Sequence, residues 1–366
     1  AIQESARLAA KEASAAGINW TFAPMVDVSR DPRWGRVMEG AGEDPFLSSE
    51  IAVARIQGFQ GKDLTSQESI MACAKHFAAY GFPEAGREYN NADIGTSTLY
   101  NIVLPPFKAS NDAGVRTFMN SFNQLNGIPA TANKFLLRDI LKEKWNFNGF
   151  VVSDWGSVAE LIPHGFAPNG KMAAKLAVKA GTDMDMESYL YVNELASLVK
   201  EGLVNSATID DAARRILKVK FELGLFDNPY KYCDLEREKK VIGSKEIIDG
   251  ALDMALKSIV LLKNENQLLP LDKRGQKVVL IGALASEKNS PLGNWRAAAK
   301  ENTGVSVLEG MQQYDEHIVY SKGPEVIIGK AEFTKEIRIN NTDITGMSEA
   351  VKAAKGADVV VMVLGE

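Results

Sequence analysis

Apolar runs of strand length alternate with helical patterns from the start of the chain to about Tyr230. This alternation is typical of parallel strands joined by crossover helices, and it constrains the fold more than any other feature of the sequence. The runs are mostly continuous, as expected for strands that are covered on both faces. We therefore expect an α/β domain whose strands lie at residues 20–28, 71–79, 116–122, 149–153 and 181–186.

A second α/β block follows a polar stretch that is rich in Lys and Glu. This stretch and the helical pattern after it, residues 229–257, indicate a linker and a connecting helix. Two domains are expected for a chain of 366 residues at about 150 residues per domain, and we place them at residues 1–228 and 258–366. The second is predicted to hold an open, mostly parallel sheet with strands at residues 259–263, 278–281, 318–321 and 359–364.

Charge balance and scarce metal-ligand residues exclude several classes of protein. Lys and Arg number 42 against 47 Asp and Glu, a net charge of −5, so we expect neither a nucleic-acid partner nor a membrane surface. No apolar run has the length of a membrane span. The three histidines are widely spaced, which argues against a histidine-built zinc site. Gly282 follows an apolar run without a GxGxxG fingerprint. We expect no metal and no cofactor.

The two ends of the sequence resemble interior positions of a longer chain. The first residues already follow a helical pattern, residues 4–16, and the last ones, residues 358–366, form an apolar run that predicts a buried strand. Because a domain rarely stops on the last residue of a core strand, we expect a segment of a longer protein. The absence of a targeting segment is then uninformative.

Asp154 is the sharpest candidate for a reactive group. It emerges from the apolar run 149–153 and is followed by Trp155, whose flat apolar face suits a sugar ring. In barrel folds this edge of the strands carries the chemistry, and glycosidases need a carboxylate that attacks an anomeric carbon or assists a water molecule. A helix-capping Asp at a strand-to-helix turn is the alternative interpretation.

Other polar and apolar groups follow the neighbouring runs. Lys75 and His76 could hold sugar hydroxyls, although a salt bridge and a buried core histidine are the plainer interpretations. Arg36 ends an Arg-rich loop that could clamp the fold or bind paired oxygens. Met119 and Phe122 could line a pocket or belong to the core.

Five strings in this order are far more specific than any one of them: Phe22-Ala-Pro-Met-Val-Asp-Val, Arg30-Asp-Pro-Arg-Trp-Gly-Arg36, Lys75-His76-Phe-Ala-Ala-Tyr80-Gly81, Met119-Asn-Ser-Phe-Asn-Gln-Leu-Asn-Gly127 and Val151-Val-Ser-Asp-Trp155-Gly. The chain resembles the glycoside hydrolase family 3 β-glucosidases, in particular the bacterial periplasmic type. The resemblance extends into the second block, through Ser258-Ile-Val-Leu-Leu-Lys-Asn264 and Leu268-Leu-Pro-Leu271.

The resemblance implies a partial (β/α)8 TIM-like barrel, without its first strand and helix, followed by a truncated α/β sandwich domain. It implies a retaining β-glucosidase that acts on terminal non-reducing β-D-glucosyl residues, with Asp154 as the nucleophile. It also implies substrate-binding roles for the residues around that nucleophile, namely Arg36, Lys75, His76, Met119 and Trp155. The positive charges among them would favour the ionised form of Asp154.

Three features depart from the family pattern. Phe122 stands where the family often has a Tyr that hydrogen-bonds the nucleophile. An early Asp that binds the sugar has no counterpart in the sequence. The acid/base Glu of the family follows a strand like 359–364; Glu366 lies at that strand end, but we expect the acid/base to lie a little further along the chain.

Several functional alternatives stay open. Within the family these are a β-xylosidase and a glucan exohydrolase, whereas residues 78–81 (Ala-Ala-Tyr-Gly) lack the Pro-Gly-His loop of the β-N-acetylglucosaminidases. From other classes they are a barrel aldolase with Lys75 as its Schiff-base lysine and a non-catalytic sugar-binding protein. The resemblance implies a small carbohydrate as the partner and a periplasmic or secreted location. The oligomeric state is left open.

Overall fold

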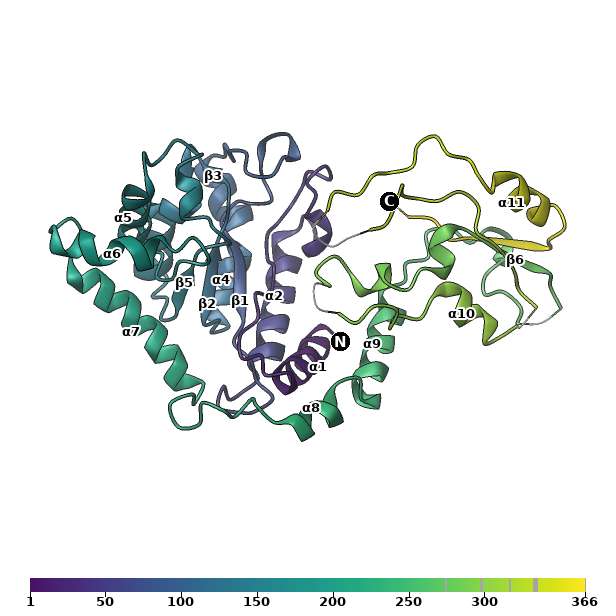
Figure 1. The fold of residues 1–366 in the computed structure, drawn as a ribbon, viewed down its shortest axis with the longest axis horizontal. Helices are drawn as coiled ribbons and strands as arrows, with labels where there is room; N and C mark the ends of the chain where they lie inside the picture. Colours follow the sequence, from purple (N-terminus) through teal and green to yellow (C-terminus); the bar gives the residue numbers. More distant parts are fainter. Residues whose placement is uncertain (274, 297–298, 316, 332–334, 366) are drawn as a thin grey trace. The chain divides into compact units, whose positions relative to one another are not determined.

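A computed structural model describes residues 1–273, 275–296, 299–315, 317–331 and 335–365. The chain divides into two compact units, Ala1–Ile259 (unit 1) and Val260–Glu366 (unit 2). Each unit contains its own three-stranded parallel sheet with helices around it (Figure 1). The chain is therefore of the α/β class, as the alternation of apolar runs and helical patterns predicts.

The sheet of unit 1 is built from β1 (Cys73–Phe77), β2 (Thr117–Asn120) and β5 (Phe150–Val152), which are parallel and lie in the order β1-β2-β5. Single parallel bridges extend this sheet on both sides. Met25 pairs with Lys75 beside β1, and Met184 pairs with Val152 beside β5. Five chain segments thus lie side by side in chain order, at the five places where the sequence predicts strands.

The outer two of these segments are less regular than predicted. Residues 20–28 join β1 only through single bridges, because Pro24 has no N–H to donate to a ladder. Its carbonyl still accepts the Lys75 N–H at 3.1 Å, and the Val26 N–H donates to the Lys75 carbonyl at 2.8 Å. These bonds hold the end of the segment next to the end of β1.

Helices surround the sheet of unit 1. The long ones are α1 (Ile2–Ala15), α2 (Pro45–Gln60), α4 (Pro105–Asp112), the π-helical η5 (Phe135–Lys144), α5 (Gly170–Ala180), α6 (Leu190–Lys200), α7 (Ser206–Glu222), α8 (Leu235–Val241) and α9 (Lys245–Ser258). Helix α2 illustrates why they begin where they do. The Asp44 side chain accepts the Phe46 and Leu47 N–H groups, and Pro45 occupies the first turn, where its missing donor costs nothing.

Side chains from the two faces of the sheet enter different apolar clusters. Ala74, Phe118 and Val151 point into the main core with the helices, where Phe118 packs edge-to-face on Phe77 at 5.5 Å. Alternation along the strands sends their neighbours to the opposite face. There Cys73 and Met119 pack in a second cluster, together with Phe150, Val152, Val219 and Leu223.

A buried ion pair ties the strand ends of unit 1 to a helix. Lys142 of η5 donates to Asp183 at 2.6 Å, with side-chain exposures of 3% and 2%. The second oxygen of Asp183 accepts the Val151 N–H at 2.8 Å. Because both oxygens are used, the carboxylate fixes η5, β5 and the segment that follows α5 to one another.

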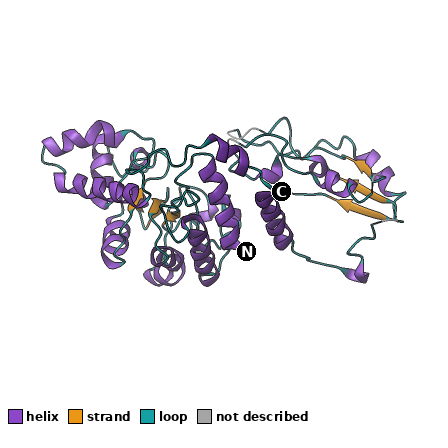
Figure 2. Cartoon of the chain, turned by 90° about the horizontal axis from the view of Figure 1, so that it is seen from below, coloured by secondary structure: helices purple, strands orange, loops and turns teal. Residues whose placement is uncertain are grey.

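The sheet of unit 2 has β6 (Val278–Ile281) at its centre, with β7 (Val319–Ser321) on one side and β8 (Val359–Met362) on the other. All pairs are parallel. Helices α10 (Val307–Gln312) and α11 (Met347–Ala354) belong to this unit (Figure 1). Figure 2 distinguishes helices, in purple, from strands, in orange, along the chain. The predicted strand 259–263 is wrong. These residues have no strand partner among those described, and Leu262 is 91% exposed.

No helix in the described part of the chain is long and apolar enough to cross a membrane.

Candidate functional site

Asp154 follows β5 on a loop that backbone hydrogen bonds hold in place. The N–H groups of Ser153 and Gly156 donate to the carbonyls of Met184 and Met186 at 2.8 and 2.9 Å. Asp154 itself is 9% exposed, and its Oδ1 accepts the Trp155 N–H at 2.7 Å. It does not cap a helix, because the next helical turn, η6 (Ala159–Leu161), has Val158 as its N-cap. The helix-capping interpretation of Asp154 is therefore wrong.

The other carboxylate oxygen of Asp154 is turned toward His76. Asp154 Oδ2 is buried and has no hydrogen-bond partner among the described residues, and His76 Nε2 lies 3.6 Å from it. His76 is buried on β1, so this contact joins the end of β1 to the end of β5 across β2. The structure thus places these two predicted site residues together.

Asp27 completes a row of three buried groups. Its Oδ2 accepts the His76 backbone N–H at 2.8 Å and lies 2.9 Å from His76 Nδ1. Sequence reasoning gave Asp27 no role of its own, although the signal was present. A single carboxylate stands inside the apolar run 20–28, and a buried charge needs a partner.

Arg36 enters the site from a loop and is held by a neighbour. Its guanidinium donates to both oxygens of Glu39, at 2.7 and 2.9 Å. It also lies over the Tyr80 ring, 5.5 Å from the centroid. The two interpretations of Arg36 are thus compatible: a carboxylate clamps it, and its charge still acts on Asp27 and Asp154.

Burial dominates the electrostatics of this cluster. It raises the pKa of Asp154, although Lys75 and Arg36 act in the opposite direction. It raises the pKa of Asp27 to about 7. Burial, together with the positive charges of Arg36 and Lys75, lowers the pKa of His76 well below its ordinary value. Burial and Arg36 also lower the pKa of Lys75. The cations favour an ionised Asp154, as predicted, but desolvation outweighs them.

The remaining predicted site residues separate into two groups. Trp155 is 63% exposed, so its ring is available to a ligand next to Asp154. Met119 is buried in the apolar cluster with Cys73 and Phe150, and its role as a pocket-lining residue stays a prediction. Glu366 lies outside the described residues.

A further polar group beside Asp154 was not foreseen. Burial raises the pKa of Glu160 on η6 to about 7, and the charge of Asp154 adds to this effect. A hydrogen bond from the Tyr89 hydroxyl lowers the pKa of Glu160 and so opposes these two effects. Tyr89 also packs on Phe122, with ring centroids 4.8 Å apart. Tyr89 therefore interacts with both Glu160 and Phe122, and no single motif of the sequence indicates this arrangement.

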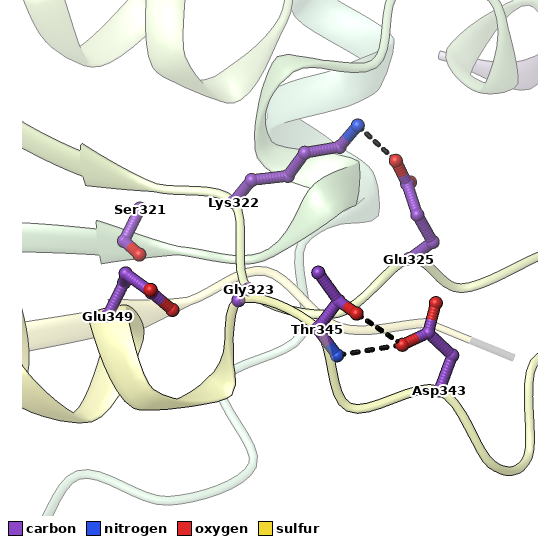
Figure 3. A pocket seen from close by; sticks show the side chains of 8 residues that line it. Ser321, Lys322, Gly323, Glu325, Asp343, Thr345 and Glu349 are labelled. Atoms are coloured by element: carbon purple, nitrogen blue, oxygen red, sulfur yellow. Dashed lines mark hydrogen bonds and ion pairs between the residues drawn. The ribbon is translucent and has the colours of Figure 1, made fainter.

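Unit 2 holds a cavity of about 360 Å³ at the carboxyl edge of its sheet, lined in part by Ser321, Gly323 and Glu349 (Figure 3). Two pairs of its polar residues bind each other. Lys322 pairs with Glu325, and Asp343 accepts from the Thr345 N–H and hydroxyl at 2.9 and 2.6 Å. Among the described residues, no group of acidic, Cys or His side chains could hold a metal ion.

Comparison with known proteins identifies the family. The glycosyl hydrolase family 3 N-terminal domain matches residues 1–219, and the family 3 C-terminal domain matches residues 259–366. The chain belongs to glycoside hydrolase family 3.

Curated relatives of the family include two kinds of β-glycosidase. A periplasmic beta-glucosidase of Salmonella typhimurium is 41% identical over the whole chain, which covers 49% of that protein. A beta-xylosidase of Formosa agariphila is 36% identical, and the chain covers 51% of it. The chain thus spans about half the length of these relatives.

Solved structures agree with this relationship. The beta-glucosidase from Listeria innocua in complex with glucose is 40% identical to this chain, with a TM-score of 0.90, and the match covers all of this chain and 48% of that one. A mutant of the same enzyme in complex with laminaribiose has a TM-score of 0.91 at 40% identity, and 49% of it is covered.

Proposed function

We propose that this chain carries the nucleophile and part of the sugar-binding site of a retaining β-glucosidase that removes terminal non-reducing β-D-glucosyl residues. The observation that supports this most is the row Asp27–His76–Asp154. In this row one buried oxygen of Asp154 has no hydrogen-bond partner in the part of the chain that the structure describes, and the charges of Lys75 and Arg36 act on the Asp154 carboxyl. The chain's 40% identity to a solved beta-glucosidase with bound glucose also supports it.

In this proposal the Asp154 carboxylate attacks the anomeric carbon while the glycosidic bond breaks, and the aglycone leaves with a proton from an acid/base carboxyl. A water molecule that gives its proton to the same carboxyl then hydrolyses the covalent glycosyl-enzyme, which releases glucose and free Asp154. Arg36, Lys75 and His76 bind sugar hydroxyls, and Trp155 offers its exposed ring to the sugar. Met119 lines the sugar-binding pocket as a further substrate-binding residue. Retention also needs an acid/base carboxyl within about 5–5.5 Å of the nucleophile. We predict that this group follows the 359–364 run.

The proposal also covers the domain architecture, the cellular location and the binding partner of the protein. We propose that the five parallel segments of unit 1 belong to a (β/α)8 barrel domain, residues 1–228, that residues 229–257 connect the domains, and that residues 258–366 form an α/β sandwich domain. We also propose a periplasmic or secreted location, supported by the name of the Salmonella relative. The proposed partner is a small carbohydrate.

Asp154→Asn in the intact enzyme tests the nucleophile. We expect kcat on an aryl β-glucoside to fall by at least about 10³-fold, since the attacking group is lost. In the unmodified enzyme, a 2-fluoro-glucoside should label Asp154, as located by peptide mass analysis. Asp139→Asn is the matched control, because Asp139 lies in an exposed ion pair with Lys134. A label on a different residue would contradict the assignment.

A β-xylosidase is the second candidate, and the 36% identity to the Formosa enzyme is the observation that favours it. The kcat/KM ratio for aryl β-glucoside and aryl β-xyloside decides between them. A xyloside preference would replace the glucosidase proposal and leave the role of Asp154 unchanged.

A further inference from the structure

Asp27 makes two hydrogen bonds with the same residue and through the same oxygen. Its Oδ2 accepts the backbone N–H of His76 at 2.8 Å and lies 2.9 Å from Nδ1 of the His76 ring. Asp27 and His76 are both buried. The carboxyl group therefore fixes both the position of the residue and the rotation of its ring.

This arrangement decides which ring nitrogen carries the proton. A backbone N–H can only donate, so Oδ2 acts as an acceptor there, and a carboxylate accepts from a ring N–H as well. With the proton on Nδ1, a neutral imidazole has its electron pair on Nε2. Burial and the nearby charges of Arg36 and Lys75 keep the ring neutral.

On the other side of the ring, the unprotonated Nε2 then faces Asp154 Oδ2, and both atoms are hydrogen-bond acceptors. His76 Nε2 and Asp154 Oδ2 lie 3.6 Å apart, beyond hydrogen-bond distance, and Asp154 Oδ2 has no hydrogen-bond partner among the described residues. Two acceptors cannot bond to each other, but each can accept from a hydroxyl that enters beside them. His76 Nε2 and Asp154 Oδ2 thus favour a ligand that donates hydrogen bonds.

We propose that Asp27 is a positioning residue that holds His76 in its Nδ1–H tautomer, so that Nε2 accepts a hydrogen bond from a sugar hydroxyl next to Asp154. The tautomer depends only on the geometry of the buried row, whereas the hydroxyl rests on the proposed glucosidase function. The two parts can therefore fail separately.

The tautomer is tested by NMR on protein labelled with ¹⁵N in histidine, with the His76 ring signals identified as those lost in His76→Gln. We expect a protonated Nδ1 and an unprotonated Nε2 when the spectrum is recorded above the Asp27 pKa of about 7, where that carboxyl is ionised and can only accept. Asp27→Leu removes the acceptor, and the proton should move to Nε2, where Asp154 is the remaining acceptor. Asp27→Asn keeps a carbonyl oxygen and should keep the Nδ1–H form. An Nε2–H ring in the unmodified protein would overturn the proposal, whether or not the variants fold.

The hydroxyl is tested with aryl β-glucosides in which one hydroxyl at a time is replaced by fluorine or by hydrogen. Fluorine cannot donate, so at the hydroxyl that His76 contacts both changes should reduce kcat/KM by about the same factor, roughly tenfold. This loss should disappear in His76→Ala. A fluoro substrate that is clearly better than the deoxy one at that position would show that His76 donates, against the proposal. If no glucoside is hydrolysed, the function fails, while the NMR result still decides the tautomer.

Discussion

The two units contain sheets of equal size and the same parallel type, but they bury them to different extents. In unit 1, every residue of β2 and β5 is buried, and so are four of the five residues of β1. In unit 2 only the central strand β6 is buried throughout, while β7 and β8 are largely accessible. Helices cover the sheet of unit 1 more completely, and this difference governs what polar groups can do in each unit.

Charged groups follow the same division. Unit 1 buries the pair Lys142–Asp183 and the row that ends at Asp154. The Lys322–Glu325 pair of unit 2 has side-chain exposures of 54% and 52%. Interactions between charges are much stronger in a low dielectric than in water. Carboxyl groups whose pKa is raised by burial, such as Asp27 and Asp154, and the buried Asp154 oxygen that has no hydrogen-bond partner among the described residues lie where the sheet is covered, and the candidate chemistry lies there.

The largest effect is expected from removing one member of the buried pair. Lys142→Met leaves the Asp183 charge uncompensated inside unit 1 and should lower the free energy of unfolding by about 3–5 kcal/mol. Lys322→Met is the matched control, with an expected loss of at most about 1 kcal/mol, because water screens this exposed pair. Urea denaturation followed by tryptophan fluorescence measures both. Equal losses would show that burial does not separate the two units.

A change of pH is expected to have a smaller effect on the free energy of unfolding than Lys142→Met. A buried carboxyl can take up a proton and lose its charge, whereas nothing replaces the ammonium group that Lys142→Met removes. The pKa of Asp27 is raised from 3.8 to about 7 by burial. The folded state therefore binds a proton more tightly than the unfolded state, and this residue costs stability as pH rises from about 4 to about 7. Asp27→Asn should become progressively more stable relative to the unmodified protein over this interval, as measured by urea denaturation.

In unit 2 the stability contribution of a carboxyl group should change with pH in the opposite direction. Hydrogen bonds from Lys288 and Ser306 lower the pKa of Glu309 from 4.5 to about 2. This residue stabilises the fold above about pH 4.5 and loses that contribution as the pH falls toward 2. Glu309→Gln should therefore be less stable than the unmodified protein above about pH 4.5, and the difference should shrink toward pH 2, as measured by urea denaturation. A pH dependence of stability that parallels that of Asp27→Asn would remove the contrast between the units.

The smallest effect concerns helix caps. Ser306 and Glu309 form a reciprocal capping box at α10, a helix without buried residues, whereas Asp44 caps α2, which buries Ala52 and Ile56. Ser306→Ala and Asp44→Ala should each cost about 1 kcal/mol. Faster amide hydrogen exchange should spread through α10 but stay within the first turn of α2. Exchange along the whole of α2 would show that burial does not hold that helix.

The sequence predicted the parallel sheet of unit 1 well, because continuous apolar runs are a local signal of strands covered on both faces. It failed for residues 259–263, which are apolar but have no strand partner among the described residues. Strand formation needs a neighbour, and a single run cannot show whether one is present. The same limit applies to Met119, whose side of the sheet follows from the register with β1 and β5 rather than from its own identity.

By itself, the sequence determined the α/β class and, through its ordered motifs, the family; it also singled out Asp154, His76, Lys75 and Arg36. Only the tertiary structure decided that Asp27 lies against His76, that the charge of Asp154 raises the pKa of Glu160, and that burial outweighs the neighbouring cations in setting the pKa of Asp154. Residue types are local, whereas desolvation and the distances between strand ends arise only when segments far apart in the chain pack together.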